Sequence, residues 1–248
     1  MISVRDIAKH FSDAKRGIVK AVDGVSFECV PGEIFGLLGA NGAGKTTLMR
    51  MLSTVISPTS GTAVIAGHDI IQDAEGVRKN IGFMSSTTAL YNRLTAKEMI
   101  YYIGQLYGLT GKDLDRRVDD VIGMLEIKEF ENRLCDKLST GQKQRVSLAR
   151  TILHDPPVLF FDEPTAGLDV LASRTIMEFI EGRKAAGKTV VFCTHIMSEA
   201  ERLCDRICVI HNGKIAAIGT FEELKQQTGE ERLEKVFLDL VLPHEATA

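Results

Sequence analysis

Alternating apolar and polar positions mark the first part of the chain. They run over residues 3–7 and 21–29, on either side of a polar segment at residues 13–17. Three apolar residues of the second segment fall on one face: Val25, Phe27 and Cys29. A period of two residues is typical of a strand with one buried face. The pattern therefore predicts half-buried antiparallel strands at the N-terminus.

Continuous apolar runs predict strands of a second kind. Residues 34–38, 158–161 and 189–193 are each almost entirely apolar. Short runs of this composition suit strands that are buried on both faces of a sheet. Helical patterns follow the last two runs, at residues 170–186 and 196–203. We therefore expect an α/β fold with an antiparallel β subdomain at its N-terminus.

Between residues 87 and 137 the pattern becomes helical. Thr95 and Glu98 have the spacing of a capping box, and apolar residues then recur at helical intervals. One such stripe, which is more typical of packing than of cofactor contacts, consists of Val118, Val121, Ile122 and Leu125. We interpret this region as a helical subdomain inserted into a domain that spans residues 1–229, with residues 230–248 as a C-terminal tail.

Charge and hydropathy narrow the possible partners. The formal net charge is −3 and the basic residues are scattered, which argues against a nucleic-acid partner. No apolar stretch approaches the roughly 18 residues of a membrane span, and the charged N-terminus differs from a secretion signal. We expect a cytoplasmic protein with five reduced thiols. A metal site at Cys204, Cys208 and His211 is disfavoured, because this spacing crosses a predicted helix-to-strand junction.

The glycine-rich segment at residues 39–47 carries the strongest chemical signal. It lies between a predicted buried strand and a helix and fills every fixed position of G-x-x-x-x-G-K-[ST]. Such a loop turns backbone N–H groups toward phosphate, while Lys45 reaches the β- and γ-phosphates and the Thr46 hydroxyl binds Mg²⁺. A chance glycine turn is the weaker interpretation. The predicted nucleotide contacts are Gly39, Asn41, Gly42, Ala43, Gly44, Lys45, Thr46 and Thr47.

Two adjacent acids, Asp162 and Glu163, follow the apolar run at residues 158–161. Ligands of open α/β sheets bind at the carboxyl ends of the strands. We expect Asp162 to hold the Mg²⁺ shell and Glu163 to polarise the attacking water as general base. The alternative is a pair of capping carboxylates without a catalytic role, which the phosphate loop upstream makes less favourable.

Residues 138–142, Leu-Ser-Thr-Gly-Gln, resemble the signature of the ABC transporter ATPases, which is usually Leu-Ser-Gly-Gly-Gln. Residues 166–169 look like the D-loop of that family, and His195 ends a strand as its switch histidine does. Phe11 matches the aromatic residue that stacks on adenine there, although a core role for Phe11 is nearly as good an interpretation. The resemblance extends from residue 3 to about residue 224.

This resemblance implies a P-loop NTPase core and an ATPase that uses ATP and Mg²⁺. It implies a homodimer arranged head to tail, in which Ser139, Gly141 and Gln142 bind the γ-phosphate held by the loop of the partner. It also implies that Lys45, Glu163 and His195 are catalytic and that His195 senses the γ-phosphate.

One position departs from the family pattern. Residues 81–86, Ile-Gly-Phe-Met-Ser-Ser, align with Ile-Gly-Tyr-Leu-Pro-Gln and place Ser86 where the family has a glutamine. A serine is shorter, so Ser86 is expected to contact Mg²⁺ only through a water. This loop, the segment at 195–199 and the tail look most similar to ATP-binding subunits of sodium-export ABC-2 transporters of the NatA type.

The resemblance thus implies a cytoplasmic subunit, peripheral on the inner face of the cell membrane, that drives a separate integral membrane permease. The cargo would be exported and could be sodium. The alternative is a single-cassette ABC ATPase with a regulatory or assembly role and no permease. A hydrophobic six-span protein encoded beside this chain would favour the transporter.

Overall fold

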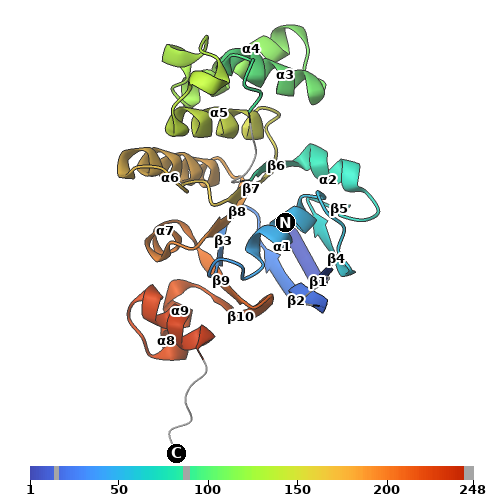
Figure 1. Ribbon diagram of the computed structural model, residues 1–248, viewed down its shortest axis with the longest axis vertical. Helices are drawn as coiled ribbons and strands as arrows, with labels where there is room; N and C mark the ends of the chain where they lie inside the picture. Colours follow the sequence, from blue (N-terminus) through green and yellow to red (C-terminus); the bar gives the residue numbers. More distant parts are fainter. Residues whose placement is uncertain (14–16, 86–89, 243–248) are drawn as a thin grey trace, which may run out of the picture.

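The computed structural model describes residues 1–13, 17–85 and 90–242, and it contains two sheets (Figure 1). The first is antiparallel, with the strand order β2-β1-β4-β5. Its strands are β1 (Ile2–Asp13), β2 (Gly17–Cys29), β4 (Ser60–Ile65) and β5 (His68–Asp69). Val25, Phe27 and Cys29 are buried on one face of β2, as the alternation predicts.

The second sheet has the strand order β10-β9-β3-β8-β7-β6. Its strands are β3 (Ile34–Leu38), β6 (Ile81–Met84), β7 (Val158–Asp162), β8 (Thr189–Thr194), β9 (Arg206–His211) and β10 (Lys214–Gly219). All pairs are parallel except β9 with β10. Every residue of β3, β7 and β8 is buried, which confirms the interpretation of the three apolar runs.

Two hydrophobic clusters cover the two faces of this second sheet. Within β7, Val158 and Phe160 pack toward the antiparallel sheet and helix α1 (Lys45–Leu52), whereas Leu159 and Phe161 pack toward the helical side. Adjacent residues of a strand point to opposite faces, so this one strand connects both cores. Helices α2 (Ala74–Asn80), α6 (Val170–Ala185) and α7 (Met197–Leu203) complete the layers.

The predicted helical region forms one end of the molecule (Figure 1). Within the predicted bounds it contains α3 (Ala96–Leu106), α4 (Gly111–Met124) and two short 3₁₀ turns, η1 (Lys128–Phe130) and η2 (Cys135–Lys137). Helix α5 (Thr140–Ile152), which begins just after these bounds, packs against α3 and α4. Thr95 and Glu98 make the expected capping box at the start of α3. The predicted stripe on α4 is buried: Val118, Val121, Ile122 and Leu125.

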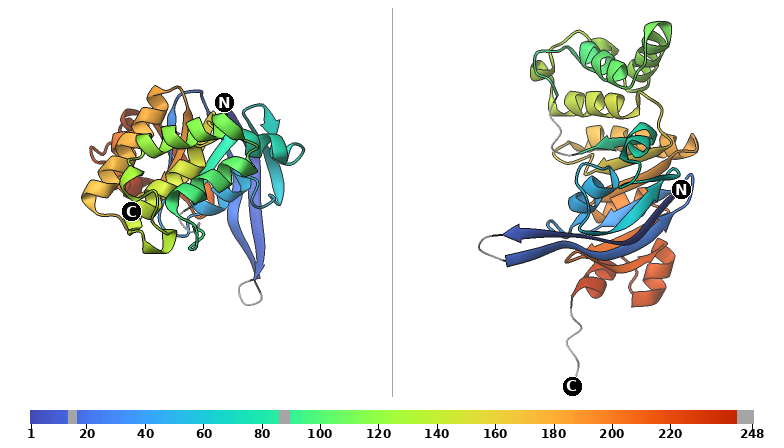
Figure 2. Two further views of the ribbon diagram at one scale, coloured as in Figure 1. Left: turned by 90° about the horizontal axis from the view of Figure 1, so that it is seen from above. Right: turned by 90° about the vertical axis from the view of Figure 1, so that its right-hand side faces the viewer.

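The first hairpin is longer than predicted. Strands β1 and β2 continue beyond the core and project from the body of the molecule (Figure 2). Backbone pairing, such as Phe11 with Val19, maintains this outer part, and the side chains at positions 11, 12 and 17–20 are exposed. Strands that bury little there lack the alternating pattern, and the predicted strand bounds were therefore too short.

The C-terminal segment forms a third small core at the opposite end of the molecule from α3 and α4 (Figure 2). Helices α8 (Phe221–Thr228) and α9 (Leu233–Val241) enclose it. Leu233, Val236 and Phe237 of α9 pack there with Leu224 of α8. Across the described parts of the chain, no helix combines the length and hydropathy needed to cross a membrane.

Candidate active site

The phosphate loop lies between β3 and α1, and its backbone conformation requires glycine. Gly42 and Gly44 have φ angles of 83° and 108°, a region that L side chains rarely adopt. A Cβ atom on Gly44 would stand 2.3 Å from the carbonyl oxygen of Ala21. The loop therefore packs directly on strand β2, which fixes its position relative to the antiparallel sheet.

Lys45 is held inside the loop. Its side chain is 4% exposed, and Nζ donates hydrogen bonds to the carbonyl oxygens of Gly39 at 2.7 Å and Ala40 at 3.2 Å. The ammonium group is thereby placed at the centre of the loop, where the motif predicts phosphate. A cavity of about 150 Å³ opens here and is lined by Ala21, Asn41, Gly42, Ala43, Gly44, Lys45, Thr46, Thr47 and Glu163.

Thr46 and Asp162 form a candidate site for Mg²⁺. The Thr46 hydroxyl donates to Asp162 Oδ1 at 3.2 Å, and Asp162 is fully buried. Its second oxygen, Oδ2, has no hydrogen-bond partner among the described residues. Burial raises the pKa of the Asp162 carboxyl, an effect that the Thr46 hydrogen bond opposes. A buried carboxylate with a vacant oxygen beside a hydroxyl fits a small hard cation such as Mg²⁺.

Glu163 stands where three elements meet. Its backbone is left-handed, with a φ angle of 51°, and its N–H donates to the Cys193 carbonyl of β8 at 3.0 Å. Oε1 lies 3.1 Å from His195 Nδ1 and 3.7 Å from Lys45 Nζ. The structure thus brings together the three residues predicted to be catalytic.

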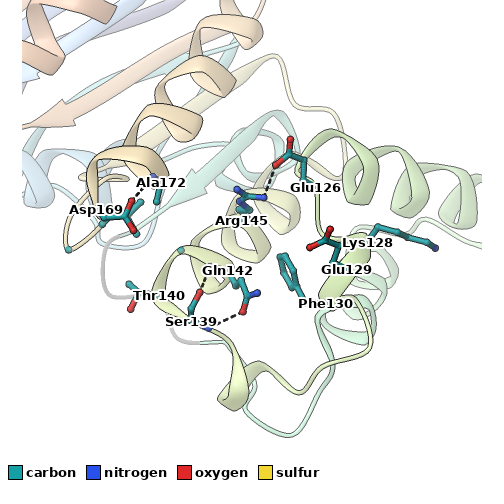
Figure 3. Close-up of a pocket in the computed structure, with 13 residues that line it drawn as sticks. Glu126, Lys128, Glu129, Phe130, Ser139, Thr140, Gln142, Arg145, Asp169 and Ala172 are labelled. Atoms are coloured by element: carbon teal, nitrogen blue, oxygen red, sulfur yellow. Dashed lines mark hydrogen bonds and ion pairs between the residues drawn. The ribbon is translucent and has the colours of Figure 1, made fainter.

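The signature lies in a separate cleft of about 1030 Å³ (Figure 3). Ser139 caps α5: its hydroxyl accepts from the Gln142 N–H at 3.3 Å, and its own N–H donates to the Gln142 side chain at 3.0 Å. Gly141 and Asp169 also line this cleft, whereas Lys45 does not. A single chain therefore keeps the predicted signature and phosphate-loop contacts apart.

Two further predicted residues remain outside these clusters. Phe11 lies on the outer part of β1, with its ring 43% exposed and Lys9 Nζ 5.4 Å from the ring centroid. It does not line the loop cavity among the described residues. Ser86 falls outside the described residues.

Two residues contact or line the phosphate loop although the sequence pattern does not predict that they do. Ala21 lines the loop cavity. Gly213, in the turn between β9 and β10, donates its N–H to the Ala43 carbonyl at 3.0 Å and accepts from the Asp23 N–H at 2.8 Å. The Asn212-Gly213 pair predicts a hairpin turn, but nothing in the pattern predicts what that turn contacts.

The order of strand, phosphate loop, signature and acid pair defines an ATP-binding cassette, and comparison with known proteins agrees. The ABC transporter family model matches residues 22–166. The chain belongs to this family and is an ATPase.

Relatives of known name match nearly the whole chain. The ABC transporter ATP-binding protein NatA of Bacillus subtilis is 38% identical over 239 residues, covering 96% of this chain and 97% of NatA. The probable multidrug ABC transporter ATP-binding protein YbhF of Escherichia coli is 35% identical over 97% of this chain but 42% of its own length. The daunorubicin resistance ATP-binding protein DrrA3 of Streptomyces coeruleorubidus is 34% identical over 91% of this chain and 71% of its own.

Solved structures have the same fold. An ATP-binding subunit of an ABC transporter superposes with a TM-score of 0.86 at 28% identity, covering 97% of this chain and 99% of that one. A dimeric post-hydrolysis structure of the cassette MJ0796 with ADP and Pi gives 0.82 at 26% identity, covering 89% and 98%. These comparisons place the chain among the ATP-binding subunits of ABC transporters.

Proposed function

We propose that two copies of this chain bind two ATP·Mg²⁺ head to tail and hydrolyse them to drive a separate membrane permease. The observation that carries this proposal is the division of the site. Lys45, Glu163 and His195 meet beside the phosphate loop, whereas Ser139 lines a different cleft of the same chain. A second copy can bring the two halves together.

The residues around the loop supply positioning and electrostatic stabilisation, which dominate phosphoryl transfer. Lys45 and the loop N–H groups hold phosphate charge, and Thr46 and Asp162 hold Mg²⁺, which would neutralise charge that develops on the phosphate oxygens. Glu163 accepts a proton from the attacking water. His195 lies 3.1 Å from Glu163 and orients that carboxylate toward the γ-phosphate.

The remaining nucleotide contacts complete the proposed site. Phe11 offers an exposed aromatic face for adenine. Ser139, Gly141 and Gln142 bind the γ-phosphate of the partner from the start of α5, because the N-terminus of a helix favours an anion. Ser86 remains a proposed Mg²⁺ contact through water.

A group of exposed aromatic and apolar side chains supports the proposal that this chain binds a permease. Tyr91 and Tyr102 meet edge to face, with 5.6 Å between their ring centroids, and Leu106 follows one turn later on α3. These side chains are 57%, 39% and 65% exposed, which is typical of an interaction surface. We place the subunit in the cytoplasm, at the inner face of the membrane, and propose export of a solute, with sodium as the cargo that the NatA resemblance favours.

Complementation between two inactive variants tests the divided site. Ser139→Arg should block the signature cleft, and Lys45→Ala should disable the phosphate loop, so each variant alone should lack ATPase activity. A mixed dimer would hold both lesions at one site and neither at the other. If one intact site suffices, an equal mixture should recover about a quarter of the wild-type rate, because half the dimers are mixed.

Full activity of Ser139→Arg alone would overturn the head-to-tail arrangement. The permease is tested separately, by looking for a hydrophobic six-span protein encoded beside this chain and testing whether the two co-purify. Leu106→Asp should abolish co-purification, and Met124→Asp, at an exposed site at the end of α4, serves as its control. An ATPase that never co-purifies would instead be a cassette without a permease.

A further inference from the structure

A buried polar pair lies directly behind His195. Thr194, the last residue of β8, is 2% exposed, and Glu199 on α7 is 5% exposed. A carboxylate at such depth is costly unless hydrogen bonds compensate for its lost hydration. An apolar side chain would fill the same space without that cost, so the acid at position 199 requires an explanation.

The two residues form hydrogen bonds with each other and with the backbone of Ile196, within the segment 194–199. The Thr194 hydroxyl donates to Glu199 Oε2 at 2.7 Å and accepts from the Ile196 N–H at 3.0 Å. The Glu199 N–H in turn donates to the Ile196 carbonyl at 3.2 Å. Ile196 has no side chain that could cap α7, and the Thr194 hydroxyl takes over one of the unpaired N–H groups there.

One of these bonds joins Thr194 and Ile196, the residues directly before and after His195. Thr194 is also paired with Leu38, the residue before the phosphate loop, in the β3–β8 register. Glu163 donates its N–H to Cys193 on the same strand. The backbone before His195 is therefore held to the strands that present the loop and the catalytic acid, and Ile196 after it is held to Thr194. The imidazole itself is 41% exposed.

We propose that Thr194 and Glu199 are positioning residues that hold the His195 imidazole against Glu163. This inference rests on the proposed function, in which His195 orients the catalytic carboxylate. Glu199 acts through the Thr194 hydroxyl: the hydroxyl has a single proton, and donating it to Glu199 leaves an oxygen lone pair directed at the Ile196 N–H. Removing either side chain releases the segment between the strand and α7.

Four variants and one control test this network by steady-state ATPase kinetics. Thr194→Val keeps the shape and removes the hydroxyl, and Glu199→Leu removes the acceptor. We expect each to lower kcat about tenfold to a hundredfold, with KM for ATP within about twofold of wild type. Thr194→Ser and Glu199→Gln retain a donor and an acceptor and should keep most of the activity. Glu201→Ala, an exposed acid on the same helix, is the matched control.

Two readouts separate positioning from general structural support. In a His195→Ala background, Thr194→Val should cause no further loss of kcat, because its effect passes through the imidazole. The Cε1–H signal of His195 in NMR spectra should shift in Thr194→Val and stay in place in Glu201→Ala. A further loss in the His195→Ala background, or an unmoved His195 signal, would overturn the inference.

The outcomes also distinguish this inference from the proposed function. If His195→Ala lowers kcat to a small but measurable value while Thr194→Val and Glu199→Leu both turn over ATP at the wild-type rate, the positioning network is wrong and the role of His195 stands. If His195→Ala itself hydrolyses ATP at the wild-type rate, the proposed role of His195 fails and the inference fails with it.

Discussion

Asp162 has the burial and the unpaired oxygen expected of a residue that binds Mg²⁺. Its carboxylate lies at the carboxyl end of β7, with one oxygen hydrogen-bonded to Thr46 and the other without a partner in the described structure. Desolvation raises its pKa. An acid whose pKa is raised by folding destabilises the folded state fully at a pH above the raised pKa, and this destabilisation is lost as the pH falls through the raised pKa toward the unfolded value of 3.8. Bound Mg²⁺ would offset the same cost.

Asp162→Asn should therefore stabilise the nucleotide-free protein while abolishing its response to Mg²⁺. We expect Tm to rise by about 2–4 °C at neutral pH, which corresponds to roughly 1 kcal/mol for a chain of this size. The gain should shrink as the pH falls through the raised pKa of Asp162 toward the ordinary value of 3.8. Differential scanning calorimetry from about pH 4 to pH 8, a range that begins near the ordinary pKa of 3.8, with and without ATP and Mg²⁺, measures both effects.

A variant that melts below wild type at neutral pH would contradict this account of Asp162. It would also be contradicted if Mg²⁺, added together with ATP, raised the Tm of Asp162→Asn as much as it raises the Tm of wild type. The exposed residue Asp113 on α4 provides a control, because Asp113→Asn should change neither Tm nor the response to Mg²⁺.

Among the elements, the β9–β10 hairpin has a role in the site that its sequence does not reveal. Its turn reaches between β2 and the phosphate loop, where Gly213 donates to Ala43 and accepts from Asp23. The φ angle of Gly213 is 75°, and a Cβ atom would lie 2.9 Å from the Ala21 carbonyl oxygen and 3.0 Å from that of Lys20. The turn of this hairpin thus lies between β2 and the phosphate loop and holds the loop through the bond to Ala43.

Gly213→Ala should weaken ATP binding by displacing this support. Loss of the bond to Ala43, about 1 kcal/mol, together with displacement of the loop, should raise the Kd for ATP about tenfold. Gly187→Ala is the matched control: Gly187 has a φ angle of 77° but open space around it, so its substitution costs backbone strain alone. Calorimetric titration with ATP would show an unchanged Kd for Gly213→Ala if the hairpin does not support the loop.

The sequence predicts those elements whose pattern reports their own environment. The runs at β3, β7 and β8 are buried on both faces, and Thr95 starts a helix because its side chain bonds the backbone three residues later. The outer half of the first hairpin and α9 are different. Backbone pairing maintains the first, and the second depends on contacts with α8 and β9, which a local pattern does not encode.

The same distinction holds within the candidate site. Lys45, Thr46 and Asp162 belong to motifs with fixed spacing, so their meeting follows from the fold. Ala21 and Gly213 contact the loop through backbone atoms. A pattern of side chain types does not show which backbone atoms will meet in the fold. Thr194 and Glu199 show a third case, because their hydrogen bond could be inferred only after the strand and the helix had been placed together.

At the scale of the whole molecule, the arrangement of clefts supports the proposed dimer. The loop cavity and the signature cleft are lined by different residues, and beside the signature the first turn of α6 exposes Val170 and Leu171 by 83% and 76%. Exposed apolar side chains next to a polar cleft are typical of an interface.

The central claim is that ATP closes the proposed dimer and that Glu163 then acts as general base in the hydrolysis of ATP. Glu163→Gln removes the general base without changing the size of the side chain. We expect this variant to bind ATP as wild type does, to lose at least about a hundredfold in turnover, and to elute as a stable dimer in gel filtration with ATP and Mg²⁺. A Glu163→Gln protein that hydrolyses ATP at the wild-type rate, or stays monomeric with ATP bound, would contradict the account.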